Sequence, residues 1–360
     1  MQVVRLLCSS ASHSASPPVT LLADRLPRWT PDRWNHPLDR DLIRRLEVDA
    51  AAAGLLGPGP QWTFGSESIG SLADMIHAWV GWGRLPVSAG GEESYATTGQ
   101  RDFVADVTDY LTRIDHLQVL RADFLEFAAQ HNWLAADLYS IMDVLELTAF
   151  LGSTPGAKVR ILEVGGGWGR LPEMLLTLFP GLIEYVMVDA VPVSLAAADA
   201  YLRAALPDVT IGNFSRGDLY QPGTFDLYIV PSWEAVHLGT SRFDAVVNIE
   251  SFQEMTQEQV DLYLSWFDQI IADGGIAYIA NSRDYVLKGG WNYPTCWRTL
   301  ARHRTPRSWT IDNSTQILRK EIGHFTAANA IVDVAYTDSL PVPEHAIADS
   351  RRRRAVVGLV

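Results

Sequence analysis

Residues 159–170 read Val-Arg-Ile-Leu-Glu-Val-Gly-Gly-Gly-Trp-Gly-Arg. The apolar, β-branched start of this stretch is typical of a buried parallel strand. The glycines that follow from Gly165 with the spacing G-x-G-x-G let a ligand approach the backbone closely and allow a positive φ. Leucine and methionine then recur at helical spacing over residues 171–178. The stretch therefore predicts a strand, a glycine-rich turn and the opening of a helix, which is the context that a nucleotide-binding turn requires.

Two acidic residues narrow the class of ligand, since the turn alone fits NAD, FAD, a nucleotide or S-adenosylmethionine. Glu163 stands two residues before the first glycine. Its carboxylate can meet the ammonium end of an amino-acid-like cofactor there, and it would repel a pyrophosphate. A second apolar run, residues 183–189, ends in Asp189, which is placed to accept hydrogen bonds from ribose hydroxyls. The alternative is a packing turn with two incidental acids at strand ends.

The composition is that of a globular protein, with 360 residues of which 48% are hydrophobic and 20% charged. This length suits one large domain or two smaller ones. A formal net charge of −13 argues against sequence-independent nucleic-acid binding, which relies on Lys and Arg at phosphates. No apolar run is long enough to cross a bilayer, so we expect no membrane partner. Only two cysteines, Cys8 and Cys296, favour a reduced, cytoplasmic setting.

A glycine- and proline-containing linker near residue 152 divides the chain into two expected parts. Residues 1–152 carry helical patterns, so we expect a helical N-terminal region that covers the carboxyl edge of the sheet and helps to bind the acceptor. Within that region, the loop that contains Tyr95 is the segment expected to reach the cofactor. Residues 153–360 alternate strands and helices, which predicts an α/β, Rossmann-like, doubly wound and mostly parallel sheet of seven strands.

The individual elements of the second part follow from its apolar runs and helical periodicity. We expect helices near 170–179, 192–205 and 256–272. The expected strands are 159–164, 183–189, 225–231, 243–249 and 275–280, and the last two are left among 307–311, 331–337 and 355–360.

Residues that follow the third and fourth strands are candidates for the site, because ligands of such sheets bind at the carboxyl ends of the strands. Pro231, Ser232 and Trp233 follow the third strand, where a tryptophan and a small hydroxyl could flank an adenine ring. The alternative for Trp233 is an ordinary place in the core. A polar cluster that begins at Asn248 and contains glutamates follows the fourth strand, as an active site requires.

Three residues are candidates for a general base. Glu250 and Glu254 stand four apart and share a face if their segment is helical. A glutamate would need burial to raise its pKa into the useful range, and the alternative for Glu254 is a cap on the following helix. His237, after the third strand, competes because its unperturbed pKa lies near neutrality, unless it is a surface residue. The density of polar groups favours the glutamates.

Residues 288–294, Lys-Gly-Gly-Trp-Asn-Tyr-Pro, predict a loop with exposed aromatic side chains that could serve as a lid or an acceptor platform. The nine histidines include no pair at H-x-x-x-H spacing, so a structural metal site is not indicated. The carboxylates could hold a divalent metal ion, but they define no ligand set, and we predict none.

On these residues the chain resembles the class I S-adenosylmethionine-dependent methyltransferases. The spacing from Glu163 to Gly169 matches the first motif of that superfamily, and Asp189 stands where its second acid belongs. More narrowly, the chain resembles the sugar O-methyltransferases assigned to actinobacterial natural-product clusters. That resemblance rests on three strings, Val188-Asp189-x-Val191-Pro192, Val230-Pro231-Ser232 and Asn248-x-x-Ser251-Phe252-Gln253-Glu254-Met255.

The resemblance implies methyl transfer from S-adenosylmethionine to a hydroxyl of a sugar or glycosylated natural product in secondary metabolism. The partner would be a small molecule, S-adenosylhomocysteine the product, and a homodimer is left open. Three alternatives remain: a non-sugar acceptor such as a polyketide hydroxyl, a cofactor-binding fold with a non-methylating role, and a nicotinamide dehydrogenase, which Glu163 disfavours. The residues expected at the cofactor are Glu163, Gly165, Gly166, Gly167, Asp189, Ala190, Pro231, Ser232, Trp233, Asn248 and Tyr95.

Overall fold

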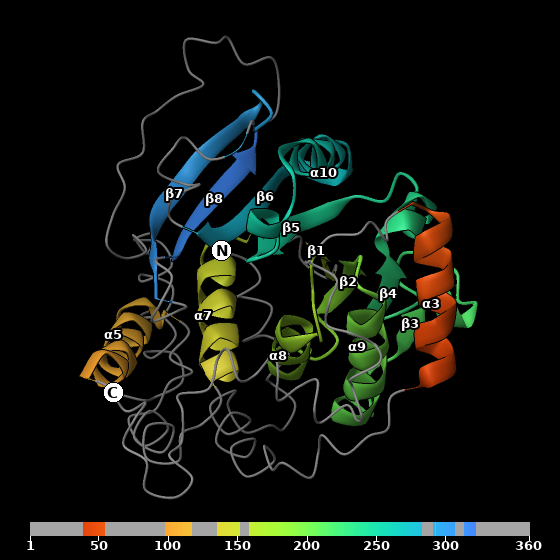
Figure 1. The fold of residues 1–360 in the computed structure, drawn as a ribbon. Helices are drawn as coiled ribbons and strands as arrows, with labels where there is room; N and C mark the ends of the chain where they lie inside the picture. The colour runs from red at the N-terminus through yellow and green to blue at the C-terminus, as the bar shows by residue number, and fades with distance from the viewer. Residues whose placement is uncertain are drawn as a thin grey trace, which may run out of the picture.

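The computed structural model describes residues 39–54, 98–116, 135–151, 158–282, 291, 293–306 and 313–321. Within these residues a sheet of eight strands runs through the molecule (Figure 1). In the order in which they lie side by side, the strands are β3 (Ile211–Asn213), β4 (Leu227–Pro231), β2 (Ile183–Asp189), β1 (Val159–Val164), β5 (Phe243–Ile249), β6 (Ile271–Ser282), β8 (Asn313–Lys320) and β7 (Trp297–Thr305).

The strands from β3 to β6 are all parallel to their neighbours, and β8 is antiparallel to both β6 and β7. In the centre of the sheet, Glu163 of β1 lies opposite Met187 of β2 and Val247 of β5. β2 is buried along its whole length and β1 along nearly all of it. Their continuous apolar runs are explained by this position, because helices cover both faces of the sheet.

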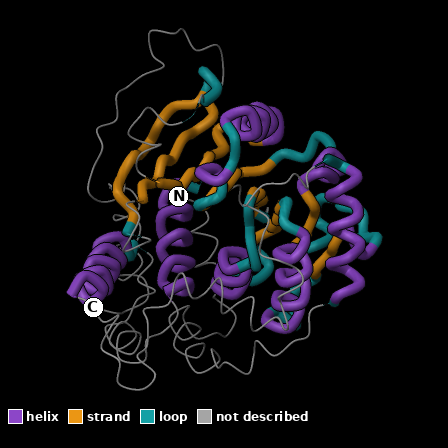
Figure 2. Tube along the Cα trace, in the orientation of Figure 1, coloured by secondary structure: helices purple, strands orange, loops and turns teal. Residues whose placement is uncertain are grey.

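A row of helices covers one face of the sheet, as Figures 1 and 2 show. Their apolar sides share one core with the sheet, which includes Leu46, Leu145 and Leu202 from the helices and Ile161 and Tyr185 from the strands. The N-terminal helices therefore pack against a face of the sheet. In their order along the row, the helices are α5 (Thr98–Ile114), α7 (Ala135–Phe150), α8 (Arg170–Leu178), α9 (Pro192–Ala205) and α3 (Arg40–Ala52).

The other face is covered by α10 (Gln257–Ile270), whose Leu264 and Phe267 join a second apolar core. Its N-terminus is fixed by a capping box in which the Thr256 side chain and the Gln259 side chain each accept a hydrogen bond from the other residue's backbone N–H. Three short 3₁₀ helices follow the carboxyl ends of strands on the site side: η4 (Phe214–Arg216), η5 (Ser232–Leu238) and η6 (Phe252–Glu254).

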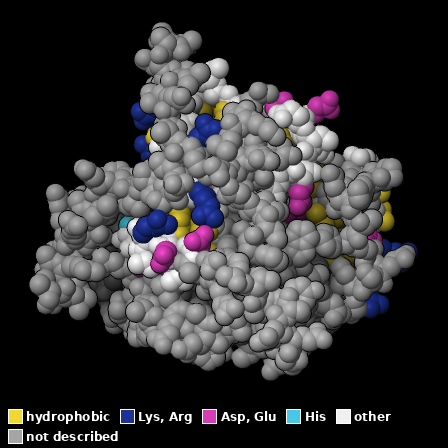
Figure 3. All heavy atoms as spheres, turned by 60° about the vertical axis from the view of Figure 1, so that its left-hand side comes forward, with side chains coloured by type: hydrophobic (Ala, Val, Ile, Leu, Met, Phe, Trp, Pro, Cys, Tyr) yellow, Lys and Arg dark blue, Asp and Glu magenta, His cyan; other side chains and the backbone are white. Residues whose placement is uncertain are grey.

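On the α5 side of the molecule, coloured Lys and Arg side chains lie close to Asp and Glu side chains (Figure 3). An ion pair joins Arg304 of β7 to Asp106 of α5, with 3.4 Å between Nη2 and Oδ2. None of the helices in the described part of the chain is long and apolar enough to span a membrane.

The predicted fold class, a doubly wound and mostly parallel α/β sheet, is confirmed. The sheet has eight strands rather than seven, because the short β3 pairs with β4 at one edge. The last two strands are Trp297–Thr305 and Asn313–Lys320. The stretches 307–311, 331–337 and 355–360 that were expected to supply them lie outside the described residues, and so does the loop of Tyr95. The division at residue 152 stays a prediction.

Candidate functional site

A small pocket opens at the carboxyl ends of the adjacent strands β1 and β5. Its volume is about 100 Å³. The lining combines the acid of the first strand, the glycine turn and the acid that follows β5, so the structure brings these predicted residues together. The lining residues are Glu163, Gly165, Gly166, Gly167, Trp168, Arg170, Ile249 and Glu250.

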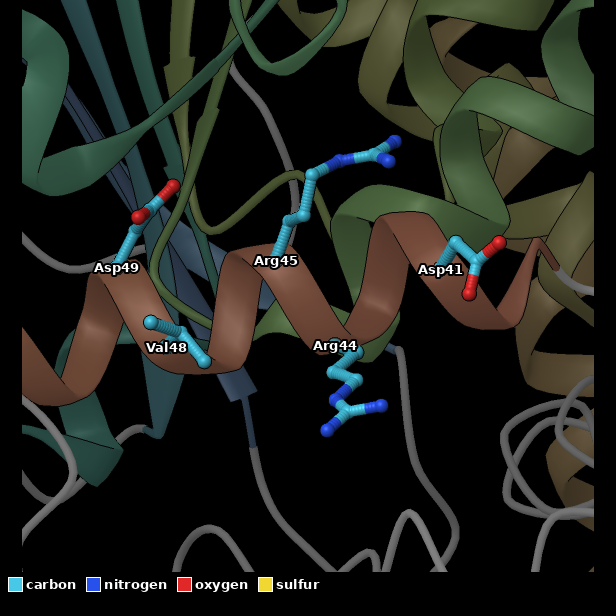
Figure 4. A pocket seen from close by; sticks show the side chains of 5 residues that line it. All are labelled: Asp41, Arg44, Arg45, Val48 and Asp49. Atoms are coloured by element: carbon cyan, nitrogen blue, oxygen red, sulfur yellow. The ribbon is translucent and has the colours of Figure 1, made fainter.

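A larger hollow of about 360 Å³ lies along the outer side of α3, between residues 41 and 49. All of its lining side chains come from this one helix, and Figure 4 shows Arg44 and Arg45 projecting from opposite sides of it. Among the described residues, no groups converge there from different elements. The candidate site is therefore the smaller pocket at the strand ends.

The glycine turn is open toward a ligand at one glycine and closed by packing at another. Gly165 has a φ of 80°, and a Cβ placed on it would lie 2.2 Å from the Ser251 Oγ. Gly167 has a φ of 58°, but a Cβ there would meet no atom within 4 Å. Both positions need the left-handed backbone that favours glycine. The space beside Gly167 is where a ligand can approach the backbone.

Glu163 is buried at the floor of the pocket, with 3% of its surface exposed. The Tyr185 hydroxyl donates a hydrogen bond to its Oε2 over 2.8 Å. Burial raises the pKa of this carboxyl to about 7, although the nearby Arg170 charge and the Tyr185 hydrogen bond act in the opposite direction. A positively charged ligand would favour the ionised form, as any opposite charge does at this range.

Asp189 ends β2 beside the same turn, and its carboxylate links the end of this strand to the turn. Its Oδ2 accepts a hydrogen bond from the Gly167 N–H over 2.9 Å, and its Oδ1 accepts one from the Val191 N–H over 2.8 Å. Burial raises its pKa to about 6, and these two bonds and one from the backbone of Ala190 oppose the shift. A carboxylate has about four lone-pair positions, so a ribose hydroxyl can still be accepted. The ribose contact stays a prediction.

The residues after β4 lie on the same edge of the sheet but outside the pocket lining. Pro231 ends the strand, and the Ser232 hydroxyl contacts the Tyr263 hydroxyl of α10. Trp233 is half-buried and packs against the larger core, in agreement with the alternative of an ordinary core residue. The aromatic side chain in the lining is Trp168, which lies edge-on to Tyr201 with 5.2 Å between ring centroids. We did not predict it, although it stands within the motif itself.

Glu250 follows β5 in a strained conformation, with a φ of 56°. Among the non-glycine residues of the described segments, it alone has a positive φ. Its N–H donates to the Ala280 carbonyl over 2.7 Å, and its Oε1 accepts from the Asn313 Nδ2 over 2.8 Å. A left-handed conformation costs a non-glycine residue roughly 1–2 kcal/mol, and strain of this kind concentrates at functional sites. The amide of Asn313 at the start of β8 therefore holds a carboxylate that faces the pocket.

The segment that holds Glu250 and Glu254 is not one helix, so the two glutamates do not share a helical face. Glu250 has a left-handed backbone, and Glu254 ends the short η6. Glu254 does not cap α10 either, since Thr256 does so. Its side chain reaches the surface, but the protein around its carboxyl group still desolvates it. This desolvation and then the charges of Glu250 and Asp189 raise its pKa. The three carboxylates thus lie near one another.

His237 lies away from the pocket at the end of η5. Its exposed ring pairs with Glu234, with 3.1 Å from Nε2 to Oε2, and stacks on Phe214 with 5.1 Å between centroids. η5 follows β4, which is separated from β5 by β2 and β1. At roughly 4.8 Å per strand spacing the two strand ends are roughly 14 Å apart. The structure therefore does not bring His237 together with Glu250.

Asn248 is fully buried and braces the turn that follows β5. Its Nδ2 donates to the Val164 carbonyl over 3.0 Å, and its Oδ1 accepts from the Phe252 N–H over 3.1 Å. These bonds fix the end of β5 to the end of β1, where the glycine turn begins. Asn248 thus supports the shape of the pocket from behind its lining.

The predicted exposed aromatic residues of 288–294 are wrong for the two that the structure describes. Trp291 is 5% exposed and lies edge-on to Phe252 with 5.5 Å between centroids. The Tyr293 hydroxyl donates to the Gln316 Oε1 over 2.5 Å, and burial raises its pKa. Both side chains pack into the second core, which also contains apolar side chains of α10 and Leu318 of β8. The remaining residues of this stretch lie outside the described segments.

The pocket suits a positively charged group, or one end of a ligand that carries both charges, because Glu163 and Glu250 face it together with Arg170. Its volume is below the roughly 300–1,000 Å³ of sites that enclose a whole drug-sized ligand. The described lining therefore fits a small group or one end of a ligand rather than a whole ligand of that size. Among the described residues, no group of three or more His, Cys, Asp or Glu side chains is arranged to hold a metal ion.

No family model matches the chain. No curated protein matches it either. Among solved structures, TrmN from Thermus thermophilus matches with a TM-score of 0.37 and 14% identity over 50% of this chain and 48% of that one. CrArsM, an arsenic(III) S-adenosylmethionine methyltransferase from Chlamydomonas reinhardtii, matches with a TM-score of 0.32 and 17% identity over 49% and 68%. The [4+2]-cyclase SpnF matches with a TM-score of 0.36 and 15% identity over 53% and 83%. At these scores the function has to be inferred from the residues of this chain.

Proposed function

We propose that this protein is an S-adenosylmethionine-dependent O-methyltransferase that acts on a hydroxyl of a sugar or glycosylated natural product. One observation carries the proposal. Glu163, the open backbone beside Gly167, and Glu250 meet in one pocket at the carboxyl ends of two adjacent parallel strands. An acidic, glycine-lined pocket in this position suits a cationic cofactor with an amino-acid end and disfavours a pyrophosphate.

When bound, S-adenosylmethionine supplies a methyl group on a positively charged sulfur. Glu163 and Arg170 would face its amino-acid end, and Asp189 would accept a hydrogen bond from its ribose. That chemistry would join the methyl carbon to an acceptor oxygen as the carbon–sulfur bond breaks, with the electron pair left on sulfur. Glu250 would take the hydroxyl proton, because a neutral hydroxyl is a poor nucleophile. Much of the rate would come from holding the two reactants in line.

A sugar acceptor is supported by the narrower resemblance of the sequence around Asp189, Pro231 and residues 248–255. The same strand ends supply the polar groups that a hydroxyl-rich acceptor needs, since Glu250, Glu254 and Asn313 lie near one another there. We also propose that the loop of Tyr95 reaches the cofactor and that the protein works in the cytoplasm. A non-sugar hydroxyl is the alternative acceptor.

Calorimetry with S-adenosylmethionine, S-adenosylhomocysteine and NAD tests the cofactor. We expect both sulfur compounds to bind and NAD not to bind. Asp189→Ala should weaken binding by roughly 1–3 kcal/mol, because charge-assisted hydrogen bonds are left unmade. An unchanged affinity in this variant would contradict the proposed contact between Asp189 and the ribose. Binding of NAD alone would overturn the proposal.

A methylation assay with matched acceptors tests the substrate class. A glycosylated natural product and its sugar-free aglycone are each incubated with the enzyme and labelled cofactor, with and without a chelator. Methylation confined to the glycosylated compound supports the sugar acceptor, and methylation of the aglycone at an equal rate supports the alternative. Cofactor binding without methyl transfer to any acceptor would favour the non-methylating role.

A further inference from the structure

A buried hydrogen-bond network anchors α7 to the sheet. Asp143 and Glu146 of this helix are both fully buried, and their spacing of three places them on one helix face. The Tyr278 hydroxyl of β6 lies 2.7 Å from the Asp143 Oδ1 and 2.5 Å from the Glu146 Oε2. The Glu146 Oε1 also contacts the Tyr110 hydroxyl and lies 3.1 Å from the His303 Nε2. Side chains from α5, β6 and β7 thus fix the two acids of α7.

The network reaches the pocket through Arg170, the first residue of α8. Its Nη1 donates to the Asp143 Oδ2 over 2.7 Å and lies 3.4 Å from the Ser140 Oγ. The Asp143 side chain is fully buried, whereas 19% of the Arg170 side chain is exposed, and Arg170 lines the pocket. Asp143 therefore contacts Tyr278 with one oxygen and Arg170 with the other. A carboxylate held at both oxygens fixes the guanidinium in place.

The held guanidinium influences the charge of Glu163. Burial is the main effect on this carboxyl and raises its pKa, Arg170 and the Tyr185 hydroxyl lower it, and Asp143 and Asp189 raise it further. Glu250 faces it across the same pocket. Without Asp143, the carboxylates left to Arg170 in the pocket would be Glu163 and Glu250. Pairing with either would cancel the negative charge that a cationic ligand needs.

We propose that Asp143 is a positioning residue for this pocket. It holds Arg170 in a buried ion pair, so that Glu163 stays available to a positively charged group of the ligand. The identity of that ligand rests on the proposed function, whereas the control of the Glu163 charge does not. A buried ion pair is weak support for stability, because apolar side chains of similar volume often do as well. The position of this ion pair beside the pocket therefore favours a role in ligand binding over a role in stability.

A titration of the ligand-free protein tests the charge control. Carbon-13 NMR of protein labelled at the glutamate carboxyls follows Glu163, and Glu163→Gln identifies its signal. Asp143→Asn should move the Glu163 midpoint to lower pH by roughly one unit, since a negative charge is lost and Arg170 approaches. Arg170→Gln should move it to higher pH, and Arg170→Lys, which keeps the charge, should stay closer to the wild type than Arg170→Gln does.

Asp199→Asn is the matched control. Asp199 is also fully buried and pairs with two arginines, at 2.6 Å to Arg216 Nη2 and 3.0 Å to Arg203 Nε, but it lies on α9 outside the pocket lining. The Asp199→Asn variant should have a lower melting temperature than the wild type and an unchanged Glu163 midpoint. An Asp143→Asn midpoint equal to the wild type, or equal shifts in Asp143→Asn and Asp199→Asn, would overturn the proposal. If Asp143→Asn does not fold, equal midpoints in Arg170→Gln and Arg170→Lys would overturn it.

Binding of S-adenosylmethionine supplies the second measurement. Asp143→Asn should weaken it about tenfold, because Arg170 then pairs with a carboxylate that the ligand needs, and Asp199→Asn should bind as the wild type does. If the wild-type protein fails to bind S-adenosylmethionine, the proposed function falls, and the titration alone still decides the role of Asp143. Normal binding by a folded Asp143→Asn variant would overturn the proposed effect on the ligand.

Discussion

Glu250 joins a strained backbone to a carboxylate that lines the pocket, which makes it the best placed of the three candidate bases. We expect Glu250→Gln to lower the methylation rate by roughly 10²–10⁴-fold, the usual contribution of a general base. Single-turnover methylation at saturating cofactor and acceptor measures it. The glutamine keeps the side-chain volume and can still contact Asn313, so that the loss reports on proton transfer.

His237→Ala and Glu254→Gln serve as comparisons, because the first lies outside the pocket and the second is exposed. Both should keep near-wild-type rates. A normal rate in Glu250→Gln together with a large loss in His237→Ala would move the base to the histidine. Normal rates in all three would place the base elsewhere or indicate a bound metal ion.

The backbone of Glu250 predicts a conflict between stability and activity. Glu250→Gly should raise the free energy of unfolding by about 1 kcal/mol, since glycine adopts a positive φ without the steric cost. The same change removes the carboxylate, so the methylation rate should fall at least as far as in Glu250→Gln. Urea denaturation measures the first effect. A glycine variant less stable than the wild type would mean that the Asn313 hydrogen bond outweighs the strain.

The raised pKa of Glu163, about 7 against a usual value of 4.5, predicts how stability depends on pH. Between these values the folded protein keeps a proton that the unfolded chain releases. The free energy of unfolding should therefore fall as pH rises across this window, by roughly 3 kcal/mol at most, and level off above it. Glu163→Gln should flatten this slope.

The affinity for the ligand should depend on pH in the opposite direction to the free energy of unfolding. A cationic ligand favours the ionised forms of Glu163 and Asp189, whose pKa values are about 7 and about 6. Affinity should rise with pH through this range, with release of protons on binding. Calorimetry in buffers of different ionisation enthalpy measures the protons released. An affinity that does not change with pH would contradict the view that these carboxylates face the positive charge.

At the scale of elements, the turn between β1 and α8 separates a packing glycine from a ligand-facing one. Gly167→Ala should cost roughly 1–2 kcal/mol through its positive φ and should weaken cofactor binding, because the methyl group enters the open space. Gly165→Ala should cost more, since its Cβ would overlap Ser251. Urea denaturation and calorimetry measure both changes. Gly217→Ala, with a φ of 95° and no atom within 4 Å, controls for strain outside the pocket.

The central strands could be predicted from the sequence because helices bury them on both faces and their residues are continuously apolar. The bounds expected for 159–164, 183–189 and 243–249 match β1, β2 and β5. β7 and β8 could not be found in this way. β8 begins with four buried polar residues, Asn313 to Gln316, several of which contact polar side chains of neighbouring elements, as in the 2.6 Å contact between the Thr305 and Thr315 hydroxyls. Such a strand lacks the apolar pattern.

The same contrast holds for the site. Glu163, Asp189 and Glu250 could be named from the sequence because each stands at or just after a strand end, where ligands of this fold class bind. Asp143 and Asn313 gave no such signal. Each acts through a partner that lies far away in the chain, Arg170 and Glu250 respectively, and only tertiary packing brings the pairs together.

At the scale of the whole molecule, the N-terminal helices and the sheet share one core, so the first part of the chain should be required for cofactor binding. A chain shortened to begin at Gly152 loses α7 and leaves Arg170, Tyr278 and His303 without their carboxyl partners. We expect this protein to aggregate or to bind S-adenosylmethionine weakly. Size-exclusion chromatography and calorimetry test this, and full turnover by the shortened chain would contradict the role of the N-terminal region.

The order of β6, β8 and β7 in the sheet has a consequence for the chain during its synthesis. Of the described strands β8 is synthesised last, but it lies between β6 and β7, so β6 gains this neighbour only after residues 313–320 emerge. β7, which emerges earlier, has β8 as its partner in the sheet and must wait for it. Open strand edges invite pairing with other chains, and charged side chains discourage it. The arginines at positions 298, 302 and 304 supply that charge along β7, so we expect this strand to resist pairing with other chains before β8 emerges.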